Sequence, residues 1–283
     1  MNVYEATVPE GAEGMQAIRY IRQAMPLLPD RAVREAFAAR DVKCGGKRVA
    51  KDEPVLPGAR VQLFSAYTVE IPVIYEDEAV LLLNKPAGIT CGEDAWGGMT
   101  VLSLMTRRAK GAYTPRLCHR LDNVTSGLLL LCKDDESEAL LRDMFERRNL
   151  TKIYQCLVKG EMRPREAVKE AYLVKNSREA AVRVVTHETP GALPIATQYE
   201  TLDFDGKLSR LRVHLITGRT HQIRAHMAFL SHPILGDDKY GDRNFNKVMK
   251  TNGLKLCATE LTLRPEGKLS YLRDRHFIIQ PAF

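Results

Sequence analysis

The chain has no long apolar run. No stretch of its 283 residues approaches the ~20 consecutive apolar residues that span a bilayer. The opening segment, MNVYEATVPEGAEG, is acidic and has no apolar centre of the kind a signal peptide needs. Internal repeats and low-complexity tracts are missing too. These absences predict a folded cytoplasmic protein rather than a membrane or secreted one.

Cysteine is present but not in pairs. The six cysteines are scattered, with no C-x-x-C spacing, at positions 44, 91, 118, 132, 156 and 257. Structural zinc sites and redox dithiols use closely spaced pairs, and disulfides persist mainly outside the cytoplasm. We therefore expect free thiols, with neither disulfides nor bound zinc.

The sequence does contain an excess of positive charge. Its 42 lysines and arginines outnumber 35 acidic residues, which gives a formal net charge of +7. A basic balance favours a polyanionic partner, nucleic acid before a membrane surface. The length suggests one large domain, or a domain and a smaller module.

Residues 14–66 hold most of that charge, +5 from ten basic and five acidic residues. Apolar spacing predicts two helices here, the second capped by Asp30, followed by a hairpin of two short strands around Pro57-Gly58. We interpret this segment as a compact basic module; the alternative is an ordinary subdomain with a solvated charged face.

Residues 68–283 have a different texture. Apolar runs such as 80–83 and 128–132 alternate with turns and a few amphipathic helices. Strand, turn and strand dominate, without regular βαβ units. This predicts an α+β domain around a long, mixed, mostly antiparallel sheet.

The stretch HRLDNVTSGLLLL, residues 119–131, puts a carboxylate directly before a turn and a buried strand. A rigid strand can aim such a side chain into a cleft, where Asp122 would be a nucleophile, a general base or a metal ligand. The alternative is structural, since an aspartate here can also hold an Asx turn over 123–126. These residues alone do not decide between the two.

A second candidate lies in LITGRTHQIRAHMAFLSHPILGD, residues 215–237. Arg219, Gln222 and Arg224 follow a strand end at the expected start of a helix. Helix N-terminal amides and two guanidiniums suit an anion, either a phosphodiester or the Asp122 carboxylate. The alternative is a capped helix with surface arginines. His221 and His226 lack the H-x-x-x-H spacing of a zinc helix.

Two further residues are weaker candidates. Tyr154, in a predicted strand, suits either a protein core or stacking on an unpaired base. Lys85 offers a cation in the rigid turn of LNKPAG.

Together these segments resemble one family. HRLDNVTSG resembles the H-R-L-D-x-x-T-S-G signature of the RluA-family pseudouridine synthases. Companion segments follow in the family's order: NKPAG at 84–88, KIY at 152–154, TGRTHQIRAH at 217–226 and HPILGDDKYG at 232–241. The basic module, residues 1–67, resembles an alpha-L RNA-binding module, but it has Asp30-Arg31 where a serine-arginine pair is usual. This resemblance implies that the module contacts RNA, through Arg31, Arg34, Lys43, Lys47 and Arg48. Cys257 also replaces the histidine of the family's L-x-L-H-A segment.

The resemblance implies the pseudouridine synthase fold with a central cleft, no cofactor and no metal. The substrate would be a uridine in structured RNA, whose glycosidic bond is broken and remade through C5. Asp122 matches the catalytic aspartate, Tyr154 the tyrosine that packs on the base, and Arg219 the arginine paired with the aspartate. Arg120 matches the family's arginine associated with the flipped-out nucleotide, and Leu256 matches an apolar residue that lines the pocket. The other substrate-binding residues expected in the cleft are His119, Lys85 and Gln222.

The expected chemistry agrees with these residue types. A base must leave the RNA stack before it can be turned over, at a cost of a few kcal/mol. Stacking on Tyr154 would return ~1–3 kcal/mol, and a guanidinium beside Asp122 would favour its charged form. Asp122 could attack C1′, add to C6, or abstract a proton to give a glycal.

Large-subunit ribosomal RNA is the favoured target, with transfer RNA as the alternative, and a monomer is expected. Two other functions stay open. One is a non-catalytic RNA-binding or ribosome-assembly protein on the same fold. The other is a hydrolytic glycosidase, which would need a second acid such as Asp237 or Asp238.

Overall fold

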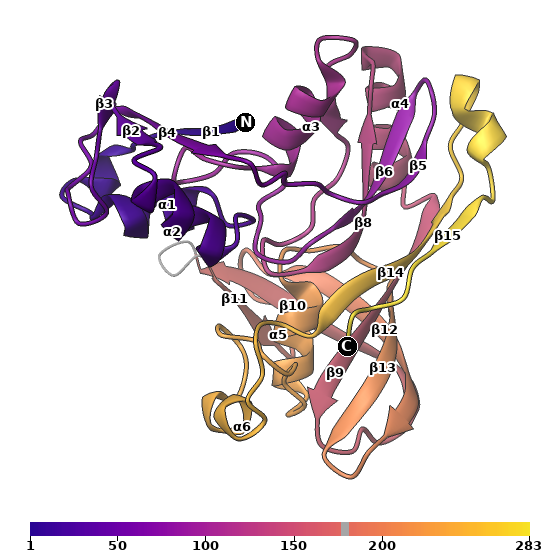
Figure 1. Ribbon diagram of the computed structural model, residues 1–283. Coiled ribbons are helices and arrows are strands. Elements are labelled where there is room, and N and C mark those ends of the chain that lie inside the picture. Colours follow the sequence, from indigo (N-terminus) through magenta and orange to yellow (C-terminus); the bar gives the residue numbers. More distant parts are fainter. Residues whose placement is uncertain (177–180) are drawn as a thin grey trace.

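The computed structural model describes residues 1–176 and 181–283, and these form two β-sheets (Figure 1). The smaller sheet is antiparallel and belongs to the N-terminal segment, by which we mean residues 1–67. Its strands, in spatial order, are β1 (Asn2–Thr7), β4 (Arg60–Ser65), β2 (Val42–Cys44) and β3 (Lys47–Arg48). Two helices and a short 3-10 turn complete it: η1 (Glu10–Ala12), α1 (Ala17–Ala24) and α2 (Asp30–Ala38).

Two local predictions for this segment are wrong. Asp30 is the first residue of α2 rather than its cap, and Pro29 occupies the cap position. The Asp30 carboxylate instead pairs with Arg22 and Arg34. The predicted hairpin around Pro57-Gly58 does not form, because β3 pairs with β2 while β4 pairs with β1 and β2.

The larger sheet is mixed and mostly antiparallel, which confirms the predicted fold class. Its path runs β11 (Ala181–Val185), β10 (Glu166–Asn176), β12 (Leu193–Phe204), β13 (Leu208–Leu215), β9 (Leu150–Lys159), β14 (Leu256–Leu263), β8 (Ser126–Cys132), β6 (Val80–Lys85) and β5 (Val73–Glu76). Two short strands lie off this path, β15 (His276–Ile278) beside β14 and β7 (Arg116–Leu117) beside β8.

The sheet changes direction at its centre, where β14 and β8 run parallel. In Figure 1, β14 passes between β8 on one side and β9 on the other. Gly127 pairs with Ala258 at this crossing and has a φ of 115°. A Cβ there would overlap the Ala258 backbone, so the close approach of the two strands requires glycine.

Strands β6 and β8 are buried on both faces, which explains their continuous leucine runs. One face packs against the helix α4 (Asp135–Glu146) and the 3-10 helix η2 (Gly267–Leu272), and the other packs against the N-terminal segment. The remaining helices are α3 (Val101–Ala109), α5 (Gln222–Phe229) and α6 (Arg243–Val248). In the described part of the chain, no helix is both long and apolar enough to cross a membrane.

Candidate active site

A cavity of about 1520 Å³ opens where the β7–β8 connection, β9 and the start of α5 meet. This volume exceeds the ~300–1,000 Å³ of a site for one small ligand. Its walls include seven of the eight residues that the sequence assigned to catalysis or substrate binding. These seven are His119, Arg120, Asp122, Tyr154, Arg219, Gln222 and Leu256.

Asp122 begins the turn that leads into β8. The Thr125 amide donates to the Asp122 carbonyl (3.1 Å), which closes the turn. Among the described residues, the carboxylate accepts its hydrogen bond from Arg224 (Nη1 to Oδ2, 3.4 Å), not from the amides of 123–126. The Asx-turn interpretation therefore lacks its hydrogen bond, and the side chain, 24% exposed, faces the cavity.

Arg224 links Asp122 to a second carboxylate. Its guanidinium makes a two-pronged contact with Asp237, at 2.8 Å from Nε and 2.9 Å from Nη2, and both side chains are almost fully buried. Burial alone would lower the Arg224 pKa, but the charges of Asp237 and Asp122 outweigh it and raise that pKa. The carboxyl of Asp237 responds oppositely: burial would raise its pKa, yet Arg224 and backbone amides lower it. Arg224 is thus a permanent cation beside Asp122.

His221 stands on the other side of the carboxylate, with Nε2 at 3.9 Å from Asp122 Oδ2. Its Nδ1 lies 2.8 Å from the Tyr240 hydroxyl, which accepts the Val182 amide hydrogen (3.0 Å). Burial lowers the His221 pKa, which favours the neutral ring. A neutral His221 that accepts from Tyr240 directs its Nε2–H toward Asp122.

Tyr154 and Leu256 lie on adjacent strands and form an apolar wall of the cavity. Tyr154 is only 7% exposed, and burial, with the nearby Asp122 charge, raises its pKa, so the hydroxyl stays protonated. Cys257 follows Leu256 and is opposite Ser126 across the parallel pair. Burial raises the pKa of this thiol, so it stays protonated and packs as a small apolar side chain.

Arg219 lines the cavity, but its predicted pairing with Asp122 is not what the described residues show. The guanidinium within ion-pair distance of Asp122 belongs to Arg224, five residues later. The buried Nε of Arg219 has no hydrogen-bond partner in the described chain. An unsatisfied donor in a cavity wall is suited to a ligand. Arg120 is exposed at the cavity wall.

Three of the expected substrate-binding residues make internal hydrogen bonds. Gln222 is buried, and its amide bonds to strand and turn atoms of 196–219. His119 accepts the Leu130 amide hydrogen on Nε2 (2.9 Å), and burial, helped by the charge of Lys152, lowers its pKa to about 3. Lys85, fully buried, is not among the residues around the cavity; its ammonium donates to the carbonyls of Pro86, Ile89 and Asn123 at 2.9, 2.8 and 3.1 Å.

The basic residues of the N-terminal segment lie away from the cavity walls and differ in their partners. Arg31 and Arg34 pair with Glu35 and Asp30 on α2. Three others project from β2 and β3: Lys43, over the Phe64 ring, and the exposed Lys47 and Arg48.

Four residues of the site were not given a catalytic or substrate-binding role in the RNA reaction from sequence: His221, Arg224, Asp237 and Tyr240. Arg224 had been considered only as one of two guanidiniums for an anion, and Asp237 only as the second acid of a hydrolase. All four belong to the segments TGRTHQIRAH and HPILGDDKYG, which the sequence singled out. Their pairing depends on how the loop after α5 folds back over the helix, and the spacing of thirteen residues between Arg224 and Asp237 carries no periodic signal.

Residues 79–229 match the family model described as RNA pseudouridylate synthase. The chain belongs to this family. It is 33% identical over 207 residues to "Ribosomal large subunit pseudouridine synthase C" of Vibrio parahaemolyticus, covering 72% of this chain and 63% of that protein. It is 30% identical over 252 residues to "Ribosomal large subunit pseudouridine synthase D" of Escherichia coli, covering 84% and 76% respectively.

The fold agrees with family membership. The structure titled "Human RNA Pseudouridylate Synthase Domain Containing 4" superposes with a TM-score of 0.61 at 22% identity, over 74% of this chain and 88% of that one. The family match spans β6 through α5, and so includes the strands and the turn that position Asp122, Tyr154 and Arg224. The resemblance inferred from sequence motifs is confirmed.

Proposed function

We propose that this protein is an RNA pseudouridine synthase that isomerises a uridine in large-subunit ribosomal RNA. The observation that carries the proposal is the Asp122 carboxylate, held by Arg224 and facing a cavity large enough for an extruded nucleotide. Relatives named as large-subunit synthases favour ribosomal over transfer RNA. The reaction belongs in the cytoplasm, where ribosomal RNA of bacteria is found.

The reaction breaks the bond between N1 of uracil and C1′ of ribose, turns the base over, and joins C5 to C1′. A proton leaves C5 and N1 gains one, so the product is an isomer of the substrate. Attack on C1′, addition to C6 and proton abstraction all require an ionised carboxylate. Arg224 supplies the positive charge that stabilises this form of Asp122 in an enclosed site.

The other side chains suit the handling of the base. Tyr154 presents a ring in the cavity wall, on which a freed uracil can stack while it is turned. Its hydroxyl, kept protonated by burial, can donate a hydrogen bond. Arg120, exposed two residues before Asp122, is placed to contact the RNA backbone or to fill the gap left by the base.

A hydrolytic glycosidase is less well supported. Such an enzyme needs a second carboxyl group flanking the scissile bond. Asp237 is fully buried and committed to Arg224, while the Asp238 side chain is 82% exposed and contacts the same guanidinium at 3.5 Å. A binding-only protein would have no chemical need for Asp122, Arg224 and Tyr154 around one cavity.

The deciding experiment maps pseudouridine in total RNA by carbodiimide treatment and primer extension, with and without this gene. We expect one or more large-subunit sites to disappear on deletion, to return with the wild-type gene, and to stay absent with the Asp122→Asn gene. A site lost from transfer RNA would support the alternative target. Release of free uracil from RNA would instead indicate a hydrolase.

A further inference from the structure

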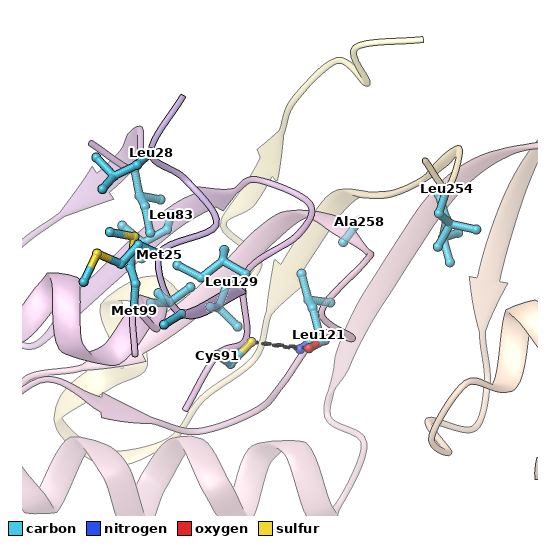
Figure 2. Close-up of a cluster of buried hydrophobic side chains, with 14 of the residues drawn as sticks. Met25, Leu28, Leu83, Cys91, Met99, Leu121, Leu129, Leu254 and Ala258 are labelled. Carbon is cyan, nitrogen blue, oxygen red and sulfur yellow. Dashed lines mark hydrogen bonds between the residues drawn. The ribbon is translucent and has the colours of Figure 1, made fainter. Parts of the chain in front are cut away.

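The N-terminal segment is packed tightly against residues 96–99. These belong to a strip of chain, residues 85–99, which also contacts the turn that contains Asp122. Figure 2 shows Met25 of this segment beside Met99, and Leu28 beside Leu83 of the large sheet, with Leu129 close by. All of these side chains are buried and belong to one continuous hydrophobic cluster. Three hydrogen bonds cross this seam: Thr7 amide to Gly97 carbonyl (3.1 Å), Tyr20 hydroxyl to Trp96 carbonyl (2.8 Å) and Met99 amide to Ala24 carbonyl (2.6 Å).

The backbone at the seam leaves no spare room. A Cβ on Gly98 would overlap the carbonyl group of Ala24, and one on Gly97 would overlap that of Thr7. Beyond these three hydrogen bonds, Arg107 ties α3 to the N-terminal strand by donating to the Val3 carbonyl (2.9 Å). A well-packed interface of this kind fixes the relative position of its two sides, unlike a flexible tether.

The strip is connected by hydrogen bonds to the turn that contains Asp122. Residues 96–99 lead into α3, whose first turn is bonded back to the strip: Val101 amide to Thr90 carbonyl (2.9 Å) and Leu102 amide to Cys91 carbonyl (3.0 Å). The Cys91 thiol in turn holds the backbone of Leu121, accepting from its amide and donating to its carbonyl, both at 3.4 Å. Figure 2 shows the Cys91 side chain directed at Leu121.

The residue after Asp122 is held by the same strip. The Asn123 carbonyl accepts from the Gly88 amide (2.9 Å) and from the buried ammonium of Lys85 (3.1 Å). Asp122 is therefore clamped through both of its neighbours by residues 85–91. These residues connect, through the start of α3, to the seam with the N-terminal segment.

We infer that the N-terminal segment is a positioning element for the Asp122 turn, an effect separate from any contact it makes with RNA. The inference rests on the proposed function, because its catalytic consequence is the rate of pseudouridine formation. A displacement of about 1 Å in a catalytic group can cost about 100-fold in rate. Disturbing the seam should therefore slow the reaction of bound RNA more than it weakens RNA binding.

The test is a wedge at the seam, Gly98→Ala. Gly98 is not in the left-handed backbone region, so alanine adds only a methyl group that pushes on Ala24. The matched control is Gly11→Ala, a substitution in η1 with no atom within 4 Å of the added Cβ. Tyr20→Phe removes one seam hydrogen bond as a milder variant, in case Gly98→Ala does not fold.

Each variant is assayed in single turnover on large-subunit ribosomal RNA from cells that lack the gene, with affinity measured separately. We expect Gly98→Ala to lower the rate constant at saturation by about tenfold to 100-fold with the dissociation constant changed less than about threefold. Tyr20→Phe should shift the rate in the same direction by less, and Gly11→Ala should match the wild type. Weaker binding at an unchanged rate would mean that the segment only tethers RNA, and the inference would fall.

Hydrogen exchange tests the coupling between the seam and the Asp122 turn without the activity assay. In Gly98→Ala or Tyr20→Phe, the Met99 amide at the seam and the Gly88, Leu121 and Thr125 amides of the turn should exchange faster together, while amides shared by β9 and β13 should not. Faster exchange at Met99 alone would contradict the coupling. If wild-type protein modifies no RNA, the proposed function fails, and exchange still reports whether the seam governs the turn.

Discussion

At the scale of single residues, Asp122 combines exposure to the cavity with a rigid backbone and a cationic neighbour. Replacing it with asparagine keeps the shape of the side chain but removes the charge that every proposed route requires. We expect Asp122→Asn to lower pseudouridine formation by at least about 1,000-fold and to leave RNA affinity within a few-fold. Single-turnover assays and filter binding measure the two effects, and substantial turnover by the variant would contradict the assignment.

Arg224 has a double role, since its guanidinium serves Asp237 in the core and Asp122 in the cavity. Removing one partner of a buried ion pair leaves the other uncompensated, which costs about 3–5 kcal/mol. We therefore expect Arg224→Gln to lower the free energy of unfolding by about that amount at pH 7, as measured by urea titration. Arg224→Lys, the control, keeps the charge but loses the two-pronged geometry. Its free energy of unfolding should lie between those of the wild type and Arg224→Gln.

The pH dependence of this effect has a definite sign. The Asp237 pKa is depressed in the folded state, so its stabilisation is present above the ordinary value of 3.8 and is lost as the pH falls through the lower folded value. The stability gap between wild type and Arg224→Gln should therefore narrow as the solution is acidified below about pH 4. A gap that stays constant into strong acid would show that Asp237 is not the group concerned.

Sequence was a good guide at this scale where the chemistry is local and a poor one where it depends on chain reversal. Asp122 could be singled out because a carboxylate, a turn and an apolar strand follow one another directly. The partner of Asp122 could not be singled out in the same way. Arg219 lies just before α5 and Arg224 lies within it, and only the three-dimensional path of the chain decides which guanidinium reaches the carboxylate. Asp30 had the right residue type for a cap, but Pro29 takes that position.

At the scale of elements, β8 is anchored by a ring nitrogen. His119 accepts the Leu130 amide hydrogen and stacks on Phe145 of α4, with ring centroids 4.4 Å apart. A protonated ring could not accept that hydrogen bond, and burial holds the pKa near 3. Because this pKa is depressed, the stabilisation is complete above the unfolded value of about 6.5 and declines as the pH falls from there toward 3.

The substitution His119→Gln tests this anchor. Glutamine retains an acceptor but does not titrate, so the variant should lose less stability than wild type between pH 6.5 and pH 4. Thermal unfolding at a series of pH values provides the comparison. An unchanged slope would mean that His119 does not link the stability of β8 to pH.

The strand pattern explains why the fold class was predictable. Runs such as 80–83 and 128–132 are buried on both faces, and this is the environment that uninterrupted apolar strands require. The parallel pairing of β8 with β14 was not predictable from such runs, since Ser126 and Leu256 are 130 residues apart. The hairpin expected around Pro57-Gly58 does not form for a related reason, because β4 pairs with β1 on one side and with β2 on the other.

At the scale of the whole molecule, the basic residues of the N-terminal segment divide into those that pair with carboxylates of the described chain and those for which that part of the chain offers no ion pair. Arg31 and Arg34 are matched by carboxylates on α2, whereas Lys47 and Arg48 are exposed on β3. We expect the double variant Lys47→Gln/Arg48→Gln to weaken RNA binding and to reduce the slope of log affinity against log salt by about 1.5. Titrations at several salt concentrations measure both quantities.

The double variant Arg31→Gln/Arg34→Gln is the matched control, because it removes the same formal charge from the same segment. Its effect on the salt slope should be smaller, since these arginines already have protein partners. Equal slopes for the two variants would show that the segment acts through its total charge rather than through β3.

The position of β14 has a consequence for how the protein is made. This strand lies between β9 and β8, so before it is synthesised the large sheet exists as two separate halves. Each half then carries an open edge with unsatisfied amides and carbonyls, which are exposed to mispairing with other chains. The closing contact spans 130 residues of sequence, which makes it an intrinsically slow step. The wall that contains Leu256 is therefore the last to be added, and a nascent chain cannot have a complete cavity until β14 has left the ribosome.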